Sequence, residues 1–264
     1  EGLGWAKFFP HTDRLDYVQP LINNIGYAIS LEKLAKIEIP QRADEIRVLL
    51  MEISRIAAHL IYLGTSSIDL GAITMFFNTF KERENIYSIL DAYTGHRMNN
   101  TYVRIGGVYA DVDEKVEGMM REFLDQFPAR IDEFEKLLTG NRIWYDRNRE
   151  VGVLTPDEAR AWSLTGPNLR GCGVEWDLRK NEPYSGYETY DFDIPVGTVG
   201  DCYDRYMVRV EEMRQSCKIA SQALERLAHS KGQDVLAEDR RYVLPPHGKV
   251  MESMEELIHQ FKIV

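Results

Sequence analysis

The chain has 264 residues, which is long enough for one large domain or two small ones with a substantial hydrophobic core. Its formal net charge of −10 argues against nucleic-acid binding, because the phosphate backbone would repel an acidic protein. No apolar run reaches the roughly eighteen residues that a membrane-spanning helix needs. We therefore expect any contact with a membrane to be made through partner proteins.

The three cysteines, Cys172, Cys202 and Cys217, form no Cys-x-x-Cys pair and cannot all pair with one another. This number and spacing of cysteines fits a protein of a reducing compartment and indicates neither a disulfide framework nor a metal site. The chain starts at Glu1 rather than at a methionine, and it stops at Val264 directly after an apolar helical run. We expect it to be a piece of a longer protein.

The first predicted helix covers residues 18–36, because Pro20 is tolerated only in a first helical turn and an apolar run follows it. It is preceded by the polar stretch His11-Thr-Asp-Arg-Leu-Asp-Tyr17, which leaves Tyr17 at the helix entrance. A phenol at the mouth of an apolar helix could hold a ligand in a cavity. On composition alone the ordinary alternative is favoured, in which the tyrosine satisfies its hydroxyl on a neighbour and the charges are caps and surface ion pairs.

A second helix is predicted to begin at Pro40. One of its faces carries Glu45, Glu52, Arg55 and His59 at helical spacing. We expect this face to be solvated or ion-paired and His59 to be a hydrogen-bonded structural residue.

Residues 64–71, bracketed by two glycines, are predicted to end the second helix. Strongly apolar neighbours should draw Asp69 inward, where a carboxylate needs a partner. The segment is either the wall of a binding pocket or a plain helix–helix corner, and the residues alone make the two about equally probable.

Further helices are predicted at 75–94, ended by Gly95, and at 112–138, with Asp111 and Glu114 as a capping box and a kink or break before Pro128. Thr155 and Glu158 indicate a short helix. Short strands are expected near 102–105 and 187–193.

Residues 165–200 follow neither the helical nor the strand period, which is typical of a functional segment or a docking surface. Asp201 should cap a long helix ending near Leu227, whose charged face we expect to be solvated or to contact another subunit. A last helix, capped by Ser253, carries apolar residues predicted to be core: Met251, Met254, Leu257, Ile258 and Phe261. The residues thus predict a single, mainly α domain over 1–264, a bundle of about six helices with one long irregular insertion and little strand.

Several long motifs, in order, resemble one family. They are His11-Thr-Asp-Arg-Leu-Asp-Tyr17, Gly64-Thr-x-x-x-Asp-Leu-Gly71, Asn100-Thr-Tyr-Val-Arg-Ile-Gly-Gly107, Leu164-Thr-Gly-Pro-x-Leu-Arg170, Trp176-Asp-Leu-Arg-Lys-x-x-Pro-Tyr184 and Asp191-Phe-Asp-Ile-Pro-Val-Gly-x-x-Gly-Asp-Cys-Tyr-Asp-Arg205. That family is the 49-kDa subunit of respiratory complex I, the NADH-quinone oxidoreductase. The resemblance covers residues 8 to 264 and implies a helical bundle of the type found in the large subunit of nickel–iron hydrogenases.

The resemblance also implies a role. In that family the subunit forms most of the quinone head-group cavity, and a neighbouring subunit carries the terminal iron–sulfur cluster that delivers electrons. By motif, Tyr17 resembles the tyrosine that hydrogen-bonds a quinone carbonyl, and Asp69 resembles the acid that pairs with a cavity histidine. Thr65 and His59 resemble residues in or near the cavity. Quinone is then a substrate, and this chain alone binds no cofactor and no metal.

The implied partners are the iron–sulfur cluster subunit, other peripheral-arm subunits and a membrane-arm subunit. The implied location is peripheral, on the cytoplasmic face of a bacterial membrane or the matrix face of the mitochondrial inner membrane. One departure from the family matters, because its cavity histidine lies in an N-terminal hairpin upstream of Glu1 and a C-terminal segment that helps to close the site is missing too. The isolated chain is therefore expected to be inactive.

Two other functions stay open at this point. A nickel–iron hydrogenase large subunit would bind its metals through two Cys-x-x-Cys motifs, and this sequence has none. A non-catalytic helical scaffold would use the irregular segment only to dock partners.

Overall fold

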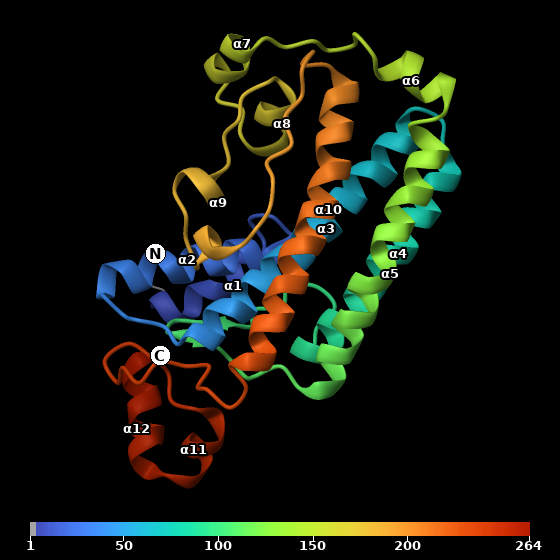
Figure 1. Cartoon of the computed structure of the whole chain (residues 1–264). Coiled ribbons are helices and arrows are strands. Elements are labelled where there is room, and N and C mark those ends of the chain that lie inside the picture. Colours follow the sequence, from blue (N-terminus) through green and yellow to red (C-terminus); the bar gives the residue numbers. More distant parts are fainter. Residues whose placement is uncertain (1–3) are drawn as a thin grey trace. The chain divides into compact units, whose positions relative to one another are not determined.

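The computed structural model describes residues 4–264 and is mainly α-helical (Figure 1). Its helices and strands are η1 (Trp5–Phe8), α1 (Phe9–Thr12), α2 (Pro20–Ala35), α3 (Gln41–Asp69), α4 (Ile73–Thr94), β1 (Val103–Arg104), β2 (Gly107–Val108), α5 (Glu114–Leu138), α6 (Arg142–Asn148), α7 (Pro156–Ala161), α8 (Gly166–Gly171), α9 (Leu178–Asn181), η2 (Tyr187–Thr189), α10 (Cys202–His229), α11 (His247–Glu252) and α12 (Met254–Ile263). The prediction of a mainly α fold with little strand is confirmed, whereas the hydrogenase-type topology stays a prediction.

The chain divides into two compact units. The first comprises residues 1–54, 87–119 and 223–264, and the second comprises residues 55–86 and 120–222. Helices α3, α4, α5 and α10 each contribute residues to both units. The expectation of one helical domain over 1–264 stays a prediction.

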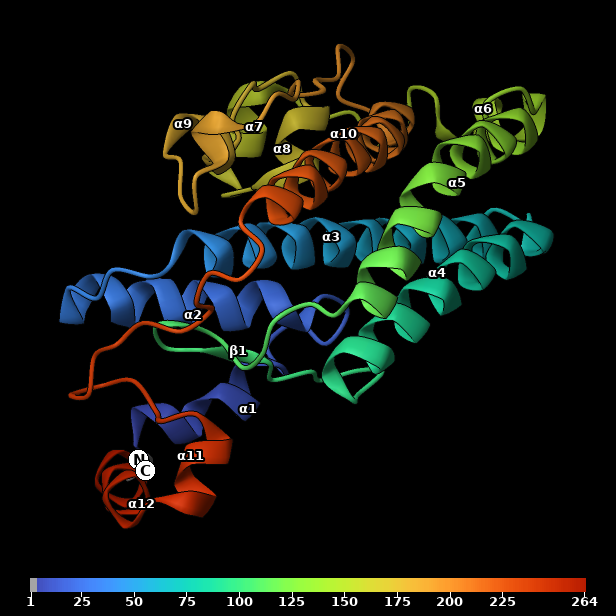
Figure 2. The ribbon, with the colours of Figure 1, turned by 60° about the horizontal axis from the view of Figure 1, so that its bottom comes forward.

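In the first unit, α2 packs against strand β1 of a short antiparallel hairpin, in which Val103 pairs with Val108 and Arg104 with Gly107 (Figure 2). Helix α2 begins at Pro20, as predicted. The apolar core of this unit is formed by residues that include Leu21, Ile25, Ala28, Ile46, Leu49, Leu50, Val103, Val108, Leu224 and Leu227. The hairpin bears out the strand predicted near 102–105.

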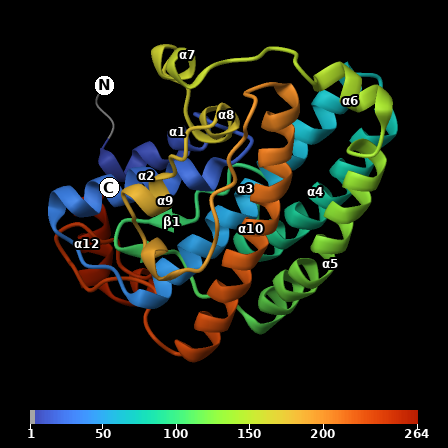
Figure 3. The same cartoon turned by 45° about the horizontal axis from the view of Figure 1, so that its top comes forward.

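The second unit contains residues 202–222 of α10. It also contains the short helices α7, α8 and α9, which precede α10 in the chain (Figure 3). Asp201 caps α10 as predicted, since its Oδ1 accepts the backbone N–H of Asp204 at 2.8 Å. One stripe of α10 in this unit is buried, formed by Tyr206, Val210, Met213, Cys217 and Ala220. Short helices within 166–171 and 178–181 correct the expectation that the whole 165–200 segment is irregular.

The second predicted helix does not end at Gly64 but continues as α3 to Asp69. A Cβ placed on Gly64 would lie 2.5 Å from Thr79 Oγ1 and 3.4 Å from Phe76 and Phe80 of α4. This glycine therefore permits close helix packing rather than a turn, and packing overrides the local helix-breaking signal.

Other local predictions are also corrected. Helix α5 continues through Pro128 instead of breaking there, with Leu124, Phe127 and Ile131 buried along one face on both sides of the proline. Asp113, not Asp111, is the residue whose side chain accepts a backbone N–H in the first turn, from Val116 at 2.7 Å. By contrast, the capping box of Thr155 and Glu158 at α7 is confirmed.

Two more expectations are wrong. Residues 187–193 contain the 3-10 helix η2 and extended chain but no strand. The apolar residues around α12 are not core, because the exposed fractions of Met251, Met254 and Phe261 are 76%, 70% and 77%. Ser253 precedes α12 as predicted, but its side chain makes no capping hydrogen bond.

Candidate functional site

Tyr17 lies in the turn between α1 and α2 in the first unit, and its side chain is 65% exposed. The turn is fixed by its buried neighbours rather than by the tyrosine. Asp13 is fully buried and accepts a hydrogen bond from Thr101, while Asn24 donates to Thr12 Oγ1 at 2.8 Å. The hydrogen bonds of Thr12 and Asp13 thus hold the backbone of the turn before α2, and the phenol of Tyr17 stays accessible to a ligand.

The other three predicted site residues belong to the second unit and lie on the last turns of α3. Thr65 and Asp69 are four residues apart, so they share one face of the helix, and both are exposed. Thr65 Oγ1 donates to the carbonyl of Ile61 at 2.8 Å. Asp69 is the final residue of the helix and is not buried in this chain, contrary to the inward position expected from its apolar neighbours.

His59 points to a different face from Thr65 and Asp69 and is buried. Its Nε2 lies 2.8 Å from Glu212 Oε2 on α10, which confirms the prediction that His59 is hydrogen-bonded. Glu212 is itself fully buried, so the charged face of α10 is not solvated as expected.

A chain of charged groups continues from Glu212. Arg170 of α8 donates from Nε to Glu212 Oε1 at 2.8 Å and from Nη2 at 2.5 Å. It also lies 3.4 Å from Asp177 Oδ2, and Asp177 in turn pairs with Arg179 at 2.8 Å. We call His59, Glu212, Arg170, Asp177 and Arg179 the histidine cluster; all five are buried.

The electrostatics of the histidine cluster follow from burial and guanidinium charge. Burial, the largest influence, lowers the pKa of His59, and Arg209 and Arg55 lower it further, although Glu212 opposes them. Burial raises the pKa of Glu212, but its hydrogen bond with His59 and the positive charges around it outweigh that effect and hold the pKa below its usual value. These shifts favour an ionised Glu212 and, chiefly through burial, a neutral His59.

Sequence reasoning missed Glu212 and Arg170. A signal was present, because Arg205, Arg209, Glu212, Ser216 and Ile219 recur at helical spacing on α10 and end in a small and an apolar residue. That stripe predicts a buried polar face rather than a solvated one. The partners could not be read from the chain, since His59 and Arg170 lie 153 and 42 residues from Glu212.

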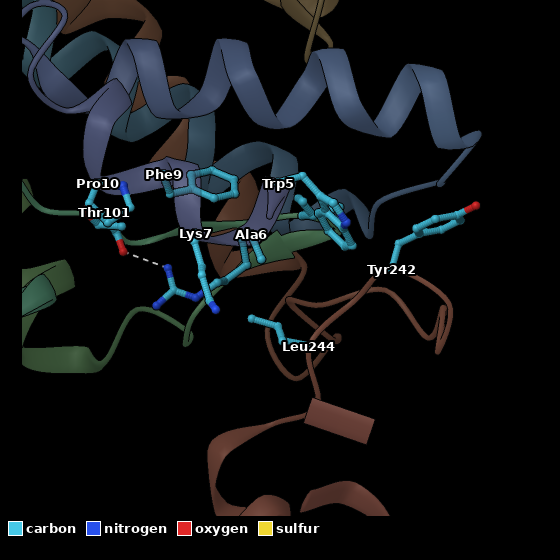
Figure 4. Close-up of a pocket in the computed structure, with 10 residues that line it drawn as sticks. Trp5, Ala6, Lys7, Phe9, Pro10, Thr101, Tyr242 and Leu244 are labelled. Atoms are coloured by element: carbon cyan, nitrogen blue, oxygen red, sulfur yellow. Dashed lines mark hydrogen bonds between the residues drawn. The ribbon is translucent and has the colours of Figure 1, made fainter. Parts of the chain in front are cut away.

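The first unit contains a pocket of about 320 Å³, shown in Figure 4. It is lined by Trp5, Ala6, Lys7, Phe9, Pro10, Thr101, Arg104, Ile105, Tyr242 and Leu244. Arg104 Nη1 donates to the carbonyl of Thr101 at 2.7 Å beside it. None of the four predicted site residues lines this pocket, and its lining offers apolar contacts and two cationic side chains but no carboxylate or imidazole.

Over the described range, 4–264, no helix combines the length and apolar character needed to cross a membrane. The same residues contain no group of three or more His, Cys, Asp or Glu side chains placed to hold a metal ion.

Comparison with known proteins gives one consistent family. The model of "Respiratory-chain NADH dehydrogenase, 49 Kd subunit" matches residues 69–264. The corresponding NADH-quinone oxidoreductase subunit of Methylacidiphilum infernorum is 48% identical over 264 residues, which cover 100% of this chain and 62% of the relative. That of Chloroflexus aurantiacus is 50% identical over 263 residues, covering 100% of this chain and 64% of the relative. The chain thus spans a little over three-fifths of the length of these relatives.

Proposed function

The chain belongs to the family of the 49-kDa subunit of respiratory-chain NADH dehydrogenase, and we propose from this premise that it forms much of the quinone head-group cavity of an NADH:quinone oxidoreductase and supplies a proton donor there. The observation that carries the proposal is the family match together with the tyrosine of the motif His11–Tyr17, whose side chain is 65% exposed.

The chemistry that the residues support is proton delivery. Reduction of a quinone to a quinol takes two electrons and two protons. This sequence carries no nucleotide-phosphate loop and no cysteine pairs, so in the proposal electrons come from an iron–sulfur cluster in a partner subunit. A phenol is a poor acid towards a neutral quinone but a competent one towards a reduced quinone anion, so Tyr17 would donate only after electrons arrive.

The proposal places this chain peripherally, among other subunits of the complex. The cluster-bearing subunit, other peripheral-arm subunits and a membrane-arm subunit surround the chain, which lies on the cytoplasmic face of a bacterial membrane or the matrix face of the mitochondrial inner membrane. Asp69 and Thr65, both exposed at the end of α3, are accessible to groups that this chain does not provide. In the proposal Asp69 pairs with a cavity histidine, and the loss of that pair when quinone is protonated leaves a charge that costs several kcal/mol to bury alone.

The test is Tyr17→Phe in the assembled complex. Removing the hydroxyl keeps the ring but removes the donor, so we expect quinone reduction to fall by a factor on the order of 10² or more. Oxidation of NADH with an artificial acceptor such as ferricyanide should be unchanged.

The matched control is Tyr109→Phe, which removes the hydroxyl of another exposed tyrosine in the first unit (51% exposed). The control should reduce quinone at the wild-type rate. Quinone reduction near the wild-type rate in Tyr17→Phe would show that the role assigned to Tyr17 is wrong.

A further inference from the structure

Besides Tyr17, the histidine cluster contains a side chain on α3, His59, that can carry a proton. We propose that Glu212 is a positioning residue that holds His59 as a neutral imidazole with its proton on Nε2, so that the lone pair of Nδ1 can take up a proton for quinone reduction. The proposal rests on the proposed function and extends it to a residue pair that the tyrosine motif does not contain.

The first support is the geometry of the pair. His59 Nε2 and Glu212 Oε2 are 2.8 Å apart, and the exposed fractions of the two side chains are 9% and 0%. A carboxylate accepts hydrogen bonds and cannot donate them, so Nε2 must carry the proton. A neutral imidazole with its proton on Nε2 has its acceptor lone pair on Nδ1.

The second support is that Glu212 itself cannot turn away. Its other oxygen, Oε1, accepts two hydrogen bonds from Arg170. Arg170 is anchored in turn by the carbonyl of Trp176 at 3.0 Å and by Asp177. Arginine and carboxylate matched in this way form a rigid pair, which leaves Oε2 aimed at the imidazole.

The third support is the balance of charge around the imidazole. Within the second unit, His59 is faced by Glu212 and Arg209 from α10 and by Arg55 from its own helix, and Arg170 from α8 adds a charge beyond Glu212. Arg209 is held over the ring of Tyr62 at 4.0 Å and donates to Asn168. Glu212 is therefore the carboxylate that would offset the charge of a transient imidazolium among these guanidinium groups.

The proton balance of the step is simple. Nδ1 of His59 takes a proton from the aqueous phase and becomes an imidazolium, whose charge Glu212 offsets across the 2.8 Å contact. Releasing that proton towards the reduced quinone restores the neutral imidazole. No electron passes through the pair.

The experiment uses Glu212→Gln in the assembled complex, with two readouts. Exchange of the C2 hydrogen of His59 for deuterium, followed by mass spectrometry across a pH series, reports the pKa of this imidazole. Quinone reduction is measured across the same pH range. We expect the pKa of His59 to fall, because the charge that raises it is gone, and quinone reduction to drop about tenfold or more.

The matched control is Glu32→Gln, which neutralises another buried carboxylate, paired with Arg47 in the first unit. It should leave the pKa of His59 and the pH profile of quinone reduction unchanged. If Glu212→Gln fails to assemble, Glu212→Asp keeps the charge, shortens the reach by one carbon, and should shift both readouts in the same direction by less.

A pKa of His59 and a pH profile that move no more in Glu212→Gln or Glu212→Asp than in Glu32→Gln would overturn the proposal and leave Glu212 a structural ion-pair partner. The outcome is separate from that of the proposed function. A failure of Tyr17→Phe to slow quinone reduction contradicts the role of Tyr17, whereas the pKa of His59 together with the pH profile of quinone reduction in Glu212→Gln still decides the role of Glu212.

Discussion

Each compact unit buries a carboxylate against an arginine, and the two arrangements differ in one respect. In the first unit Glu32 accepts two hydrogen bonds from Arg47 at 2.8 and 2.6 Å, and it also accepts the backbone N–H of Gly106 at 2.7 Å. Arg47 donates further to the carbonyls of Arg104 and Gly107, both at 2.9 Å. This pair ties α2 and α3 to the hairpin and contains no histidine.

The histidine cluster of the second unit uses the same acid–guanidinium contact but adds His59. A histidine is the side chain whose ordinary pKa lies near physiological pH, so its charge can change in that range. Burial and ion pairing alone therefore do not mark a functional site. What distinguishes the second unit is a titratable group held in one orientation by that pairing.

The largest expected effect comes from removing the arginine of the Glu32–Arg47 pair. Arg47→Met would leave Glu32 buried without its cation, and such a loss destabilises a protein by about 3–5 kcal/mol. Chemical unfolding of the chain measures it. Arg142→Met, which removes the exposed partner of Asp146 on α6, should leave the unfolding midpoint unchanged. Equal midpoints for Arg47→Met and the wild-type chain would mean that the pair does not hold the hairpin.

A smaller effect is expected on the pH dependence of stability, to which His59 of the second unit contributes. Because the folded-state pKa of His59 lies below its unfolded value of about 6.5, the unfolded chain binds more protons just below that pH. Stability is therefore full above about pH 6.5 and falls as the pH drops below it, with a slope of up to about 1.4 kcal/mol per pH unit. Glu212, whose pKa is also lowered, adds a loss only at more acidic pH, below its ordinary range.

His59→Gln should remove the part of this slope that begins just below about pH 6.5, whereas Glu32→Gln should change the overall stability and keep that part. Urea unfolding at a series of pH values gives both quantities. A wild-type stability that rises as the pH falls from about 7 to 5.5 would contradict the neutral state assigned to His59.

Local signals were enough to predict much of the fold. Pro20 at the start of α2, the capping box of Thr155 and Glu158, and Asp201 at α10 each act within a few residues, and each was correct. Gly64 failed as a helix breaker because its role is set by Thr79 and Phe76 of another helix, which no local pattern contains.

The candidate site was predicted unevenly for the same reason. Tyr17, Thr65 and Asp69 stand in recognisable motifs, so the sequence identifies them, but the carboxylate of Asp69 proved exposed where apolar neighbours had suggested burial. The charged face of α10, which includes Glu212, was expected to be solvated or to contact another subunit, because the partners of Glu212, His59 and Arg170, come from distant parts of the chain. Family resemblance supplies roles for single residues, whereas the histidine cluster emerges only once the helices are folded.

The central claim is that Tyr17 meets the quinone. A structure of the assembled complex with a bound quinone or head-group analogue tests it most directly. We expect the hydroxyl oxygen of Tyr17 within hydrogen-bond distance, about 2.5–3.2 Å, of a head-group carbonyl oxygen, with Asp69 in the wall of the same cavity. A head group bound elsewhere, with Tyr17 in contact only with water or with another subunit, would contradict it.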